Sequence, residues 1–379
     1  MQFEFATSAR IVFGVGAARD LPKAAAAMGR RALLVTGASP ERAAALLAGM
    51  DTVAFAVAEE PTLDLIRRGV AFAREEGCDL VVAVGGGSAI DAGKALAALT
   101  TNHGDPLDYL EVIGRGQPLS EPPLPFIAVP TTAGTGAEVT RNAVLGSPEH
   151  HVKASLRSAS MLPRLAIVDP ELTITLPRSV TASTGLDTLT QLIEPYVSVR
   201  ANPMTDLFCV EGIRCVTRAL ARAWENGGDL EARTDMSWAA LLGGMALANA
   251  GLGAVHGFAA PVGGMFPAPH GAVCAALLPH TMEVNVRALT ARMPQSSALD
   301  RYSEVARLLT GRADASANDG VEWVGRLCRK LEIAPLRAYG VRREHYQDLV
   351  AKAARTSSMK GNPISLSPAE LQEILERAG

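Results

Sequence analysis

Four polar side chains in the second half of the chain have types and spacings that could bind a metal ion. Asp187 and Gln191 are four residues apart in the stretch TGLDTLTQLIEPY, so on a helix they would share one face. His256 and His270 are fourteen residues apart and flank GFAAPVGGMFPAP, an apolar segment rich in Gly and Pro. Two histidines with one carboxylate bind Fe(II), and catalytic Zn(II) sites use a similar triad. A metal held this way polarises a carbonyl oxygen and stabilises alkoxide charge.

The amide of Gln191 leaves the nature of this site open. An amide oxygen is a weaker donor than an imidazole nitrogen, so we expect iron or zinc to be retained less firmly than by four strong ligands. Alternatively, the amide NH2 donates to a substrate oxygen, or the site holds no metal and His256 and His270 act as hydrogen-bond donors. In each case we expect His256, His270 and Gln191 to be the catalytic residues. Glu194, seven residues after Asp187, is expected to support the site rather than to bind metal.

Two stretches in the first half predict a site for a nucleotide phosphate. AVGGGSAIDAGK follows a predicted strand and opens a predicted helix, and the glycines at 85–87 let backbone N–H groups approach a pyrophosphate. Ser88 is expected to cap this helix, with Asp91 as its capping-box partner. The second stretch, PTTAGTGAEVT, offers hydroxyls and bare backbone to ribose, phosphate or nicotinamide, and Lys153 could neutralise phosphate. A tight strand-to-helix turn without a ligand is the alternative.

The residues after ALLVT bear on the choice of cofactor. Dinucleotide folds usually place an acid after such a strand, where it binds the ribose hydroxyls. This chain has Gly37, Ala38 and Ser39 instead, so no carboxylate would repel a 2′-phosphate. Ser39 and the following helix N-terminus could bind that phosphate, and Arg42 is close in sequence. The pattern favours NADP(H) over NAD(H).

The elements that must position these residues change character along the chain. Apolar runs such as RRALLVTG, DTVAFAV and DLVVAVGGGS alternate with helical periods, which predicts a parallel sheet covered by helices. The N-terminal MQFEFATSARIVFGVG is expected to form two short strands. Helical periods dominate after Pro177, at roughly 181–198, 203–224, 230–250, 299–312, 318–331, 343–356 and 368–378. We predict a Rossmann-like α/β dinucleotide-binding domain over residues 1–178, an all-α metal and substrate domain over residues 179–379, and a cleft between them.

Bulk composition excludes several classes of function. The chain has 379 residues with 48% hydrophobic content, enough for roughly two domains with full cores. The net charge of −3 and the lack of a long basic run give no support for binding nucleic acid or a membrane surface. No apolar stretch is long enough to span a bilayer, and the N-terminus lacks the layout of a signal peptide. None of the five cysteines forms a C-x-x-C pair, which favours a reducing cytosol and mostly buried thiols.

Taken together, the motifs resemble the iron-containing (group III) alcohol dehydrogenases over nearly the whole chain. The motifs that carry the resemblance are GGGSAIDAGK, VPTTAGTGAEVT, AIVDPELTITLP, TGLDTLTQLIEPYVS, VHGFAAPVGGMFPAPHGAVCAALLPHTMEVN and the late GNP. The resemblance implies a dehydroquinate-synthase-like fold and hydride transfer between a nicotinamide and an alcohol–carbonyl pair. It also implies a homodimer or a larger homo-oligomer.

Carried over by position, the resemblance implies roles for individual residues. Metal ligands are implied at Asp187, His256 and His270. Cofactor contacts are implied at Gly86, Gly87, Ser88, Thr131, Thr132 and Lys153, and Gly37 stands where NAD-preferring members carry an acid. From the residues themselves, we also expect Ser39, Asp91 and Thr135 to contribute to the cofactor site. The chain departs from the family at two positions. Gln191 stands where the family has its fourth metal ligand, a histidine. Ala260 stands where the family has a histidine that handles protons.

Four functions compete. The first is a metal-dependent NAD(P) alcohol dehydrogenase or aldehyde reductase, using Fe(II) or Zn(II) and a small or medium substrate. The second is a metal-independent NAD(P)H reductase of an oxo acid, similar to maleylacetate reductases. The third is a carbon–oxygen lyase like dehydroquinate synthase, against which the scarcity of Lys and Arg over 250–280 argues. The fourth is a nucleotide-binding protein without catalysis.

Overall fold

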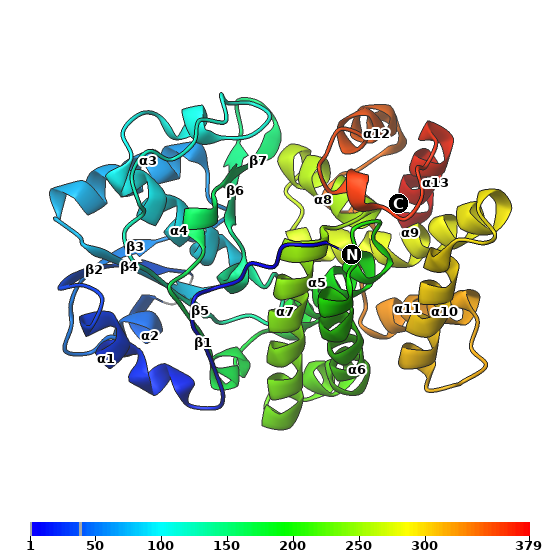
Figure 1. The fold of residues 1–379 in the computed structure, drawn as a ribbon, viewed down its shortest axis with the longest axis horizontal. Coiled ribbons are helices and arrows are strands. Elements are labelled where there is room, and N and C mark those ends of the chain that lie inside the picture. Colours follow the sequence, from blue (N-terminus) through cyan, green and yellow to red (C-terminus); the bar gives the residue numbers. More distant parts are fainter. Residues whose placement is uncertain (1, 38–39) are drawn as a thin grey trace. The chain divides into compact units, whose positions relative to one another are not determined.

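A computed structural model of the protein describes residues 2–37 and 40–379 (Figure 1). The chain divides into two compact units. The α/β unit consists of residues 6–132 and 136–174, and the helical unit consists mainly of Thr175–Gly379, joined by residues 2–5 and Ala133–Thr135. A parallel α/β unit followed by a helical unit is the predicted fold class, which is confirmed.

A six-stranded sheet forms the centre of the α/β unit. Its strand order is β1-β8-β5-β4-β2-β3, and every neighbouring pair is parallel. The strands are β1 (Ile11–Phe13), β8 (Leu165–Val168), β5 (Phe126–Pro130), β4 (Leu80–Gly85), β2 (Arg31–Thr36) and β3 (Asp51–Ala56). Successive residues of each strand enter opposite faces, so the apolar runs feed two separate cores.

Helices cover both faces of the sheet. The core that contains Leu33 and Val35 includes α3 (Leu63–Glu75) and α4 (Gly87–Thr101), whereas the core that contains Leu34 includes α1 (Leu21–Ala26) and α2 (Pro40–Ala45). In Figure 1, α3 lies above the sheet, and α1 and α2 lie below it. The burial of both faces explains why the strands read as continuous apolar runs rather than alternating ones.

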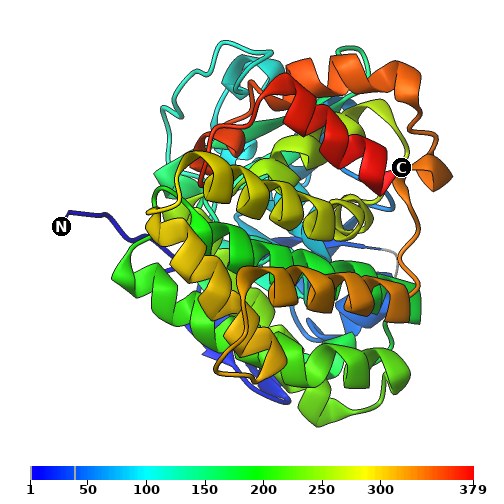
Figure 2. The ribbon, with the colours of Figure 1, turned by 90° about the vertical axis from the view of Figure 1, so that its right-hand side faces the viewer.

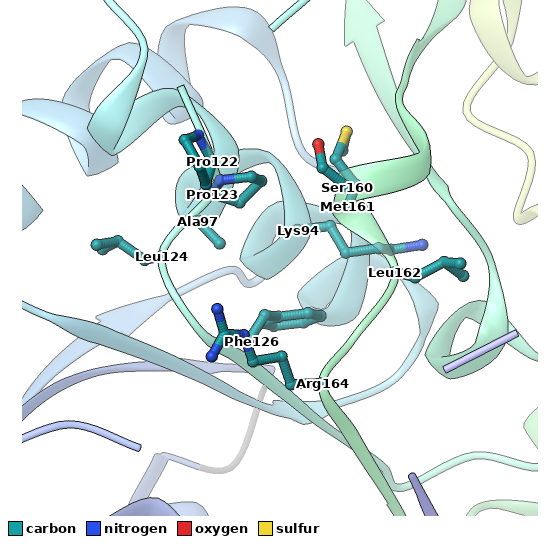
Figure 3. Close-up of a pocket in the computed structure, with 10 residues that line it drawn as sticks. All are labelled: Lys94, Ala97, Pro122, Pro123, Leu124, Phe126, Ser160, Met161, Leu162 and Arg164. Atoms are coloured by element: carbon teal, nitrogen blue, oxygen red, sulfur yellow. The ribbon is translucent and has the colours of Figure 1, made fainter. Parts of the chain in front are cut away.

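An antiparallel hairpin that the sequence did not predict packs on α4. It consists of β6 (Asn142–Ser147) and β7 (Val152–Arg157). The fully buried ammonium of Lys94 holds it, because Nζ lies 2.9 Å from Asp91 Oδ1 and 2.9 Å from Thr140 Oγ1, and also donates to the carbonyl of Asn142. Lys94 also borders a pocket of about 170 Å³, with Pro122, Phe126 and Arg164 among the other lining residues (Figure 3). None of the predicted site residues lines this pocket.

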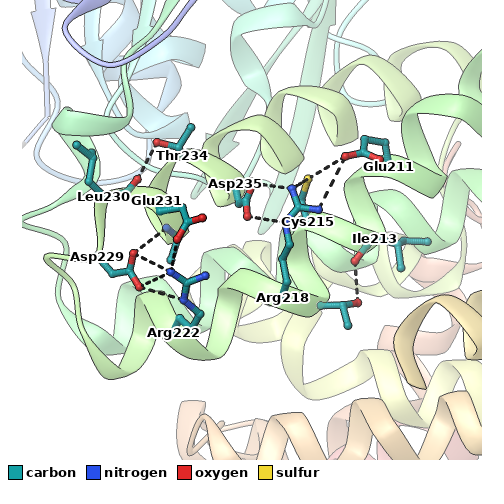
Figure 4. Close-up of polar contacts among 12 residues, drawn as sticks. Glu211, Ile213, Cys215, Arg218, Arg222, Asp229, Leu230, Glu231, Thr234 and Asp235 are labelled. Atoms are coloured by element: carbon teal, nitrogen blue, oxygen red, sulfur yellow. Dashed lines mark hydrogen bonds and ion pairs between the residues drawn. The ribbon is translucent and has the colours of Figure 1, made fainter. Parts of the chain in front are cut away.

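The helical unit holds helices α5 to α13 (Figure 2). Their bounds are α5 (Arg178–Val197), α6 (Pro203–Glu225), α7 (Leu230–Ala250), α8 (Ala254–Met265), α9 (His270–Arg292), α10 (Ser297–Thr310), α11 (Ala317–Lys330), α12 (Tyr346–Ala353) and α13 (Pro368–Ala378). Ion pairs join α6 to α7 and its N-terminal turn: Arg218 Nε lies 2.6 Å from Asp235, and Arg222 binds Asp229 and Glu231 (Figure 4).

Two helices of this unit were not anticipated. Helices α8 and α9 contain internal Pro261 and Pro279, which weaken the helical signal of the sequence. Buried apolar surface on both helices outweighs that cost. No single helix in the described chain has the length and hydropathy of a membrane span; α7 and α8 reach that level only as a pair, across a 98° bend.

Two local predictions were wrong. The N-terminal segment forms only β1 rather than two strands, and residues 2–5 are irregular. Ser88 does not cap α4: the helix starts at Gly87 with Gly86 as N-cap, and no side chain in the described chain caps it. Asp91 instead binds Lys94 through Oδ1 and accepts from the Val144 N–H through Oδ2 at 3.0 Å. The strand ends directly in glycines, so the helix can begin before the serine.

Candidate active site

Four side chains of the helical unit converge on one point. Asp187, His256, His270 and Cys274 each offer one ligand atom, and these atoms all lie within 4.8 Å of one another. Asp187 Oδ1 lies 3.4 Å from His256 Nε2 and 3.7 Å from His270 Nε2. The sequence therefore predicted three of the four members, and Cys274 was missed among cysteines expected to be buried and inert.

Three helices supply these atoms. Asp187 lies in the middle of α5, His256 lies in the first turn of α8, and His270 begins α9, with Cys274 one turn further along. A spacing of four residues places His270 and Cys274 on one face of α9. The signal that could have identified Cys274 was this spacing after a candidate histidine ligand.

Glu194 fixes the orientation of His256. Its Oε2 lies 2.7 Å from His256 Nδ1, which leaves Nε2 directed at Asp187. Its Oε1 accepts from the Val255 N–H at 2.7 Å, while Asn362 of the late GNP motif accepts from the Ala254 N–H at 3.1 Å. Two buried side-chain oxygens thus accept from the free backbone N–H groups in the first turn of α8. The N-cap residue, Gly253, has no side chain that could do so. The supporting position expected for Glu194 agrees with these contacts.

In this cluster, burial and the neighbouring charges shift the pKa values of the side chains in opposite directions. Burial would raise the pKa of Asp187, but the nearby His270 and His256 hold it below its usual value. Burial would lower the pKa of His270, but negative charge at Cys274 and Asp187 raises it to about 9. The pKa of His256 is also well above its usual value, because Cys274, Asp187 and Glu194 outweigh the effect of burial. The Asp187 carboxylate and the two imidazoles therefore stabilise one another's charged forms.

At the predicted site, two buried side-chain oxygens have no hydrogen bond among the described residues. Asp187 Oδ1 and Gln191 Oε1 are both shielded from solvent, and neither has a hydrogen-bond partner among the described residues. Leaving such an atom unpaired costs about 1–3 kcal/mol. Asp187 Oδ1, which lies 3.4 Å and 3.7 Å from the two imidazoles, is an oxygen with which a cation at this point would pair. Gln191 is 2% exposed on α5, one turn after Asp187.

The cluster reaches solvent on the His270 side. The side chain of His270 is 35% exposed, whereas those of His256 and Asp187 are almost fully buried. Ala260 is partly exposed on α8, and its methyl group has no exchangeable proton to relay. Phe258, on the same helix, is fully buried and belongs to the core.

The glycines expected to bind the cofactor meet at the carboxyl ends of β2 and β4. β2 and β4 are neighbours in the sheet. The strand that follows β2 in the chain, β3, lies on one side of this pair, whereas the strand that follows β4, β5, lies on the other side, so the strand order reverses here. A Cβ on Gly85 would lie 2.6 Å from Ala89 Cβ and 3.1 Å from Gly37 N. Open α/β sheets bind ligands at such a reversal. The uncapped first turn of α4, with Gly86, Gly87 and Ser88, is suited to an anion.

The remaining predicted cofactor residues have varied settings. The Thr131 N–H donates to the Gly85 carbonyl at 2.9 Å, and Thr132 lies 3.4 Å from where a Cβ of Gly86 would stand, so these two loops adjoin. Thr135 follows Gly134, whose carbonyl accepts from Thr188 on α5 at 3.2 Å.

Lys153 and Asp91 are less available to a cofactor than predicted, because both already have partners. Lys153 is largely buried and forms an ion pair with Glu60, so a phosphate would compete with that carboxylate. Both carboxylate oxygens of Asp91 are already bound. Ser39 lies outside the described residues.

Comparison with known proteins identifies the family. The family model "Iron-containing alcohol dehydrogenase" matches residues 8–170, and its C-terminal counterpart, "Fe-containing alcohol dehydrogenase family, C-terminal", matches residues 181–379. The chain belongs to the iron-containing alcohol dehydrogenases. The predicted family and enzyme class are thereby confirmed, and this iron-type dehydrogenase is an alcohol–aldehyde oxidoreductase.

Individual relatives of this dehydrogenase agree with that assignment. It is 38% identical over 323 residues to alcohol dehydrogenase 4 of Schizosaccharomyces pombe, covering 85% of this chain and 74% of the relative. It is 35% identical over 338 residues to 1,3-propanediol dehydrogenase of Citrobacter freundii, covering 87% and 84%. A crystal structure of 1,3-propanediol oxidoreductase matches all of both chains, with a TM-score of 0.92 and 33% identity.

One solved relative contains a nicotinamide cofactor. The sulfoacetaldehyde reductase of Bifidobacterium kashiwanohense, in complex with NAD+, matches with a TM-score of 0.86 and 28% identity, covering 99% of this chain and 98% of that one. The family uses NAD(H) and a metal, and this chain contains a cluster able to hold a metal.

Proposed function

We propose that this dehydrogenase interconverts an alcohol and an aldehyde or ketone with NAD(P)(H), assisted by a metal that Asp187, His256 and His270 hold. The observation that carries the proposal is the convergence of these ligand atoms around an Asp187 oxygen that is buried and lacks a hydrogen bond. The donor types suit Fe(II) or Zn(II), because both accept imidazole nitrogen and carboxylate oxygen. When bound, such a metal supplies Lewis acidity, which polarises a carbonyl and favours hydride transfer.

The residues around the cluster have distinct tasks in this proposal. Glu194 fixes the His256 ring, so that Nε2 faces the centre without reorganisation. The more exposed His270 forms the side from which a substrate oxygen approaches. Gln191 offers either an amide oxygen to the centre or an NH2 group to the substrate oxygen. Ala260 has no exchangeable proton. The proton of the alcohol would therefore be exchanged by His270, by water or by the cofactor ribose.

The α/β unit provides the nucleotide site in the same proposal. The first turn of α4 binds the pyrophosphate with its N–H groups, and the threonines at 131 and 132 bind ribose, phosphate or nicotinamide. Gly37 leaves space at the end of β2, since the nearest atom to an added Cβ is Gly85 Cα at 4.0 Å. This space, with no carboxylate at Gly37, favours NADP(H) over NAD(H).

The metal content of the protein tests the central part of the proposal. Protein purified without added metal should contain iron or zinc, or take up either stoichiometrically. A strong chelator should abolish aldehyde reduction with NADPH, and added metal should restore it. Full activity in chelator, with no bound metal, would contradict metal assistance.

A metal-independent reductase of an oxo acid is the second candidate. The observation in its favour is the set of raised pKa values of His256 and His270, which suits two cationic hydrogen-bond donors to an anionic substrate. The chelator experiment separates the candidates: this enzyme would reduce an oxo acid fully in chelator and would show little preference for uncharged aldehydes.

We also propose that the protein forms a homodimer. Leu207 and Met204 on α6 are 71% and 37% exposed, and Phe3 of the N-terminal segment is 46% exposed. The N-terminal segment meets this helix, since the rings of Phe5 and Phe208 lie 5.6 Å apart. Light scattering should give twice the mass of 39.6 kDa, and Leu207→Glu should shift the mass toward the monomer.

A further inference from the structure

We propose that Cys274 is the fourth protein ligand of the metal centre, so that α9 supplies a thiolate in place of the histidine that α5 lacks at Gln191. This inference rests on the proposed function, because it assumes that Asp187, His256 and His270 hold a metal. It differs from the expectation that Gln191 fills the fourth position.

The distances fit a four-coordinate ion. Cys274 Sγ lies 3.7 Å from His270 Nε2 and 3.8 Å from His256 Nε2. Asp187 Oδ1 lies 3.7 Å from His270 Nε2 and 3.4 Å from His256 Nε2. Ligands at about 2.0–2.3 Å from zinc, arranged as a tetrahedron, are about 3.3–3.6 Å apart. These four separations are close to those of a tetrahedral site, and all four ligand atoms lie within 4.8 Å of one another.

Other observations point to a ligand and not only to a buried thiol. Cys274 is fully buried, and its Sγ contacts the imidazole nitrogens of His256 and His270. Cys328 differs, because its Sγ donates to the Ala275 carbonyl. Asp187 Oδ1, buried and without a hydrogen bond among the described residues, is directed at the same point.

The donor set has a consequence for metal choice. A thiolate is a softer and stronger donor than the amide oxygen of Gln191, so one sulfur, two nitrogens and one oxygen favour Zn(II) or Co(II) over Mg(II). The same set also binds Zn(II) more tightly than Fe(II). We therefore expect this member of an iron-named family to retain zinc, and Gln191 to be left for hydrogen bonding.

Cobalt substitution tests the inference without measuring activity. Co(II) bound to the wild-type protein should show intense near-ultraviolet absorption from thiolate-to-cobalt charge transfer. Cys274→Ser should bind Co(II) without that absorption. Cys328→Ala, the matched cysteine control, and Gln191→Ala should keep it. Competition with a chelator should show a loss of zinc affinity for Cys274→Ser larger than the roughly 10–100-fold that the loss of an outer partner costs.

Each outcome separates the two proposals. If the wild type binds Co(II) stoichiometrically without charge-transfer absorption, or if Cys274→Ser retains it, Cys274 is not a ligand and the three-ligand function stands. If the wild type binds neither Co(II) nor Zn(II), both proposals fail. Should Cys274→Ser not fold, zinc X-ray absorption of the wild-type protein decides, since one sulfur at about 2.3 Å is expected and its absence would overturn the inference.

Discussion

Glu194 is the residue whose contacts assign it the clearest supporting task. Glu194→Gln replaces one carboxylate oxygen with an NH2 group, which cannot accept from His256 Nδ1. The ring would then have to change its tautomer or its orientation. We expect the zinc affinity of the variant to fall about 10–100-fold while the helix content is kept. Chelator competition followed by metal analysis measures this change.

Glu283→Gln is a suitable control for that variant. Glu283 is a partly exposed carboxylate of the same unit that binds Arg377 at 2.7 Å and has no contact with Glu194 or His256 among the hydrogen bonds of the described residues. Its loss should leave zinc affinity unchanged. Equal zinc affinities of Glu194→Gln and the wild type would show that the 2.7 Å contact to His256 does not position a ligand.

At this scale, sequence reasoning could go only part of the way. Asp187, His256 and His270 could be predicted because few residue types bind metals and because their surroundings are apolar. Cys274 could not be assigned, since a cysteine in an apolar helix is usually a core residue. Only the three-dimensional meeting of α5, α8 and α9 shows which side of α9 its thiol faces.

At the scale of elements, the turn from β4 into α4 depends on a missing side chain. Gly85→Ala would place a Cβ 2.6 Å from Ala89 Cβ and 3.1 Å from Gly37 N. We expect the free energy of unfolding to fall by about 1–3 kcal/mol, and the nucleotide affinity to fall with it. Urea unfolding and nucleotide titration measure the two effects. Gly37→Ala should leave stability nearly unchanged, because the nearest atom to its Cβ in the described part of the chain, chain neighbours apart, is Gly85 Cα at 4.0 Å.

The end of β2 should set the choice between the two nicotinamide cofactors. A carboxylate in Gly37→Asp would repel a 2′-phosphate while accepting hydrogen bonds from ribose hydroxyls. We expect the ratio of kcat/KM for NADPH over NADH to fall at least about tenfold, which corresponds to about 1.4 kcal/mol. Gly37→Asn tests size without charge. An unchanged ratio in Gly37→Asp would place the adenosine ribose elsewhere.

Elements were predicted well where a single pattern dominated. The strands of the parallel sheet and most of the later helices follow from apolar runs and helical periods. Helices α8 and α9 did not follow, because Pro261 and Pro279 lower the local propensity while tertiary burial stabilises the helix. The N-cap of α4 lies two residues before the expected Ser88, at Gly86, because a glycine N-cap needs no side chain.

For the whole molecule, one buried acid predicts how stability depends on pH. Burial raises the pKa of Glu138 to about 7, opposed by its own N–H and by Lys94. The folded state therefore binds a proton that the unfolded state releases above its usual pKa of 4.5. Stability should be greatest below pH 4.5 as far as this group is concerned, and should fall by about 3 kcal/mol as pH rises through 7.

Glu138→Gln isolates this contribution. The variant should lose the fall between pH 5 and pH 8 and should be more stable than the wild type at pH 8. Guanidinium unfolding followed by circular dichroism at both pH values gives the comparison. A wild type whose stability changes with pH as little as that of the variant would show that Glu138 is not protonated in the folded state.

The pairing of donors on two helices also bears on how such a centre can change during evolution. Positions 187 and 191 on α5 and positions 270 and 274 on α9 are each one helical turn apart, and α5 packs against α9. A chain with histidine at 191 and cysteine at 274 would hold five donors around four positions. Either could then be lost without loss of the ion, so a ligand can pass from one helix to the other through intermediates that all remain loaded.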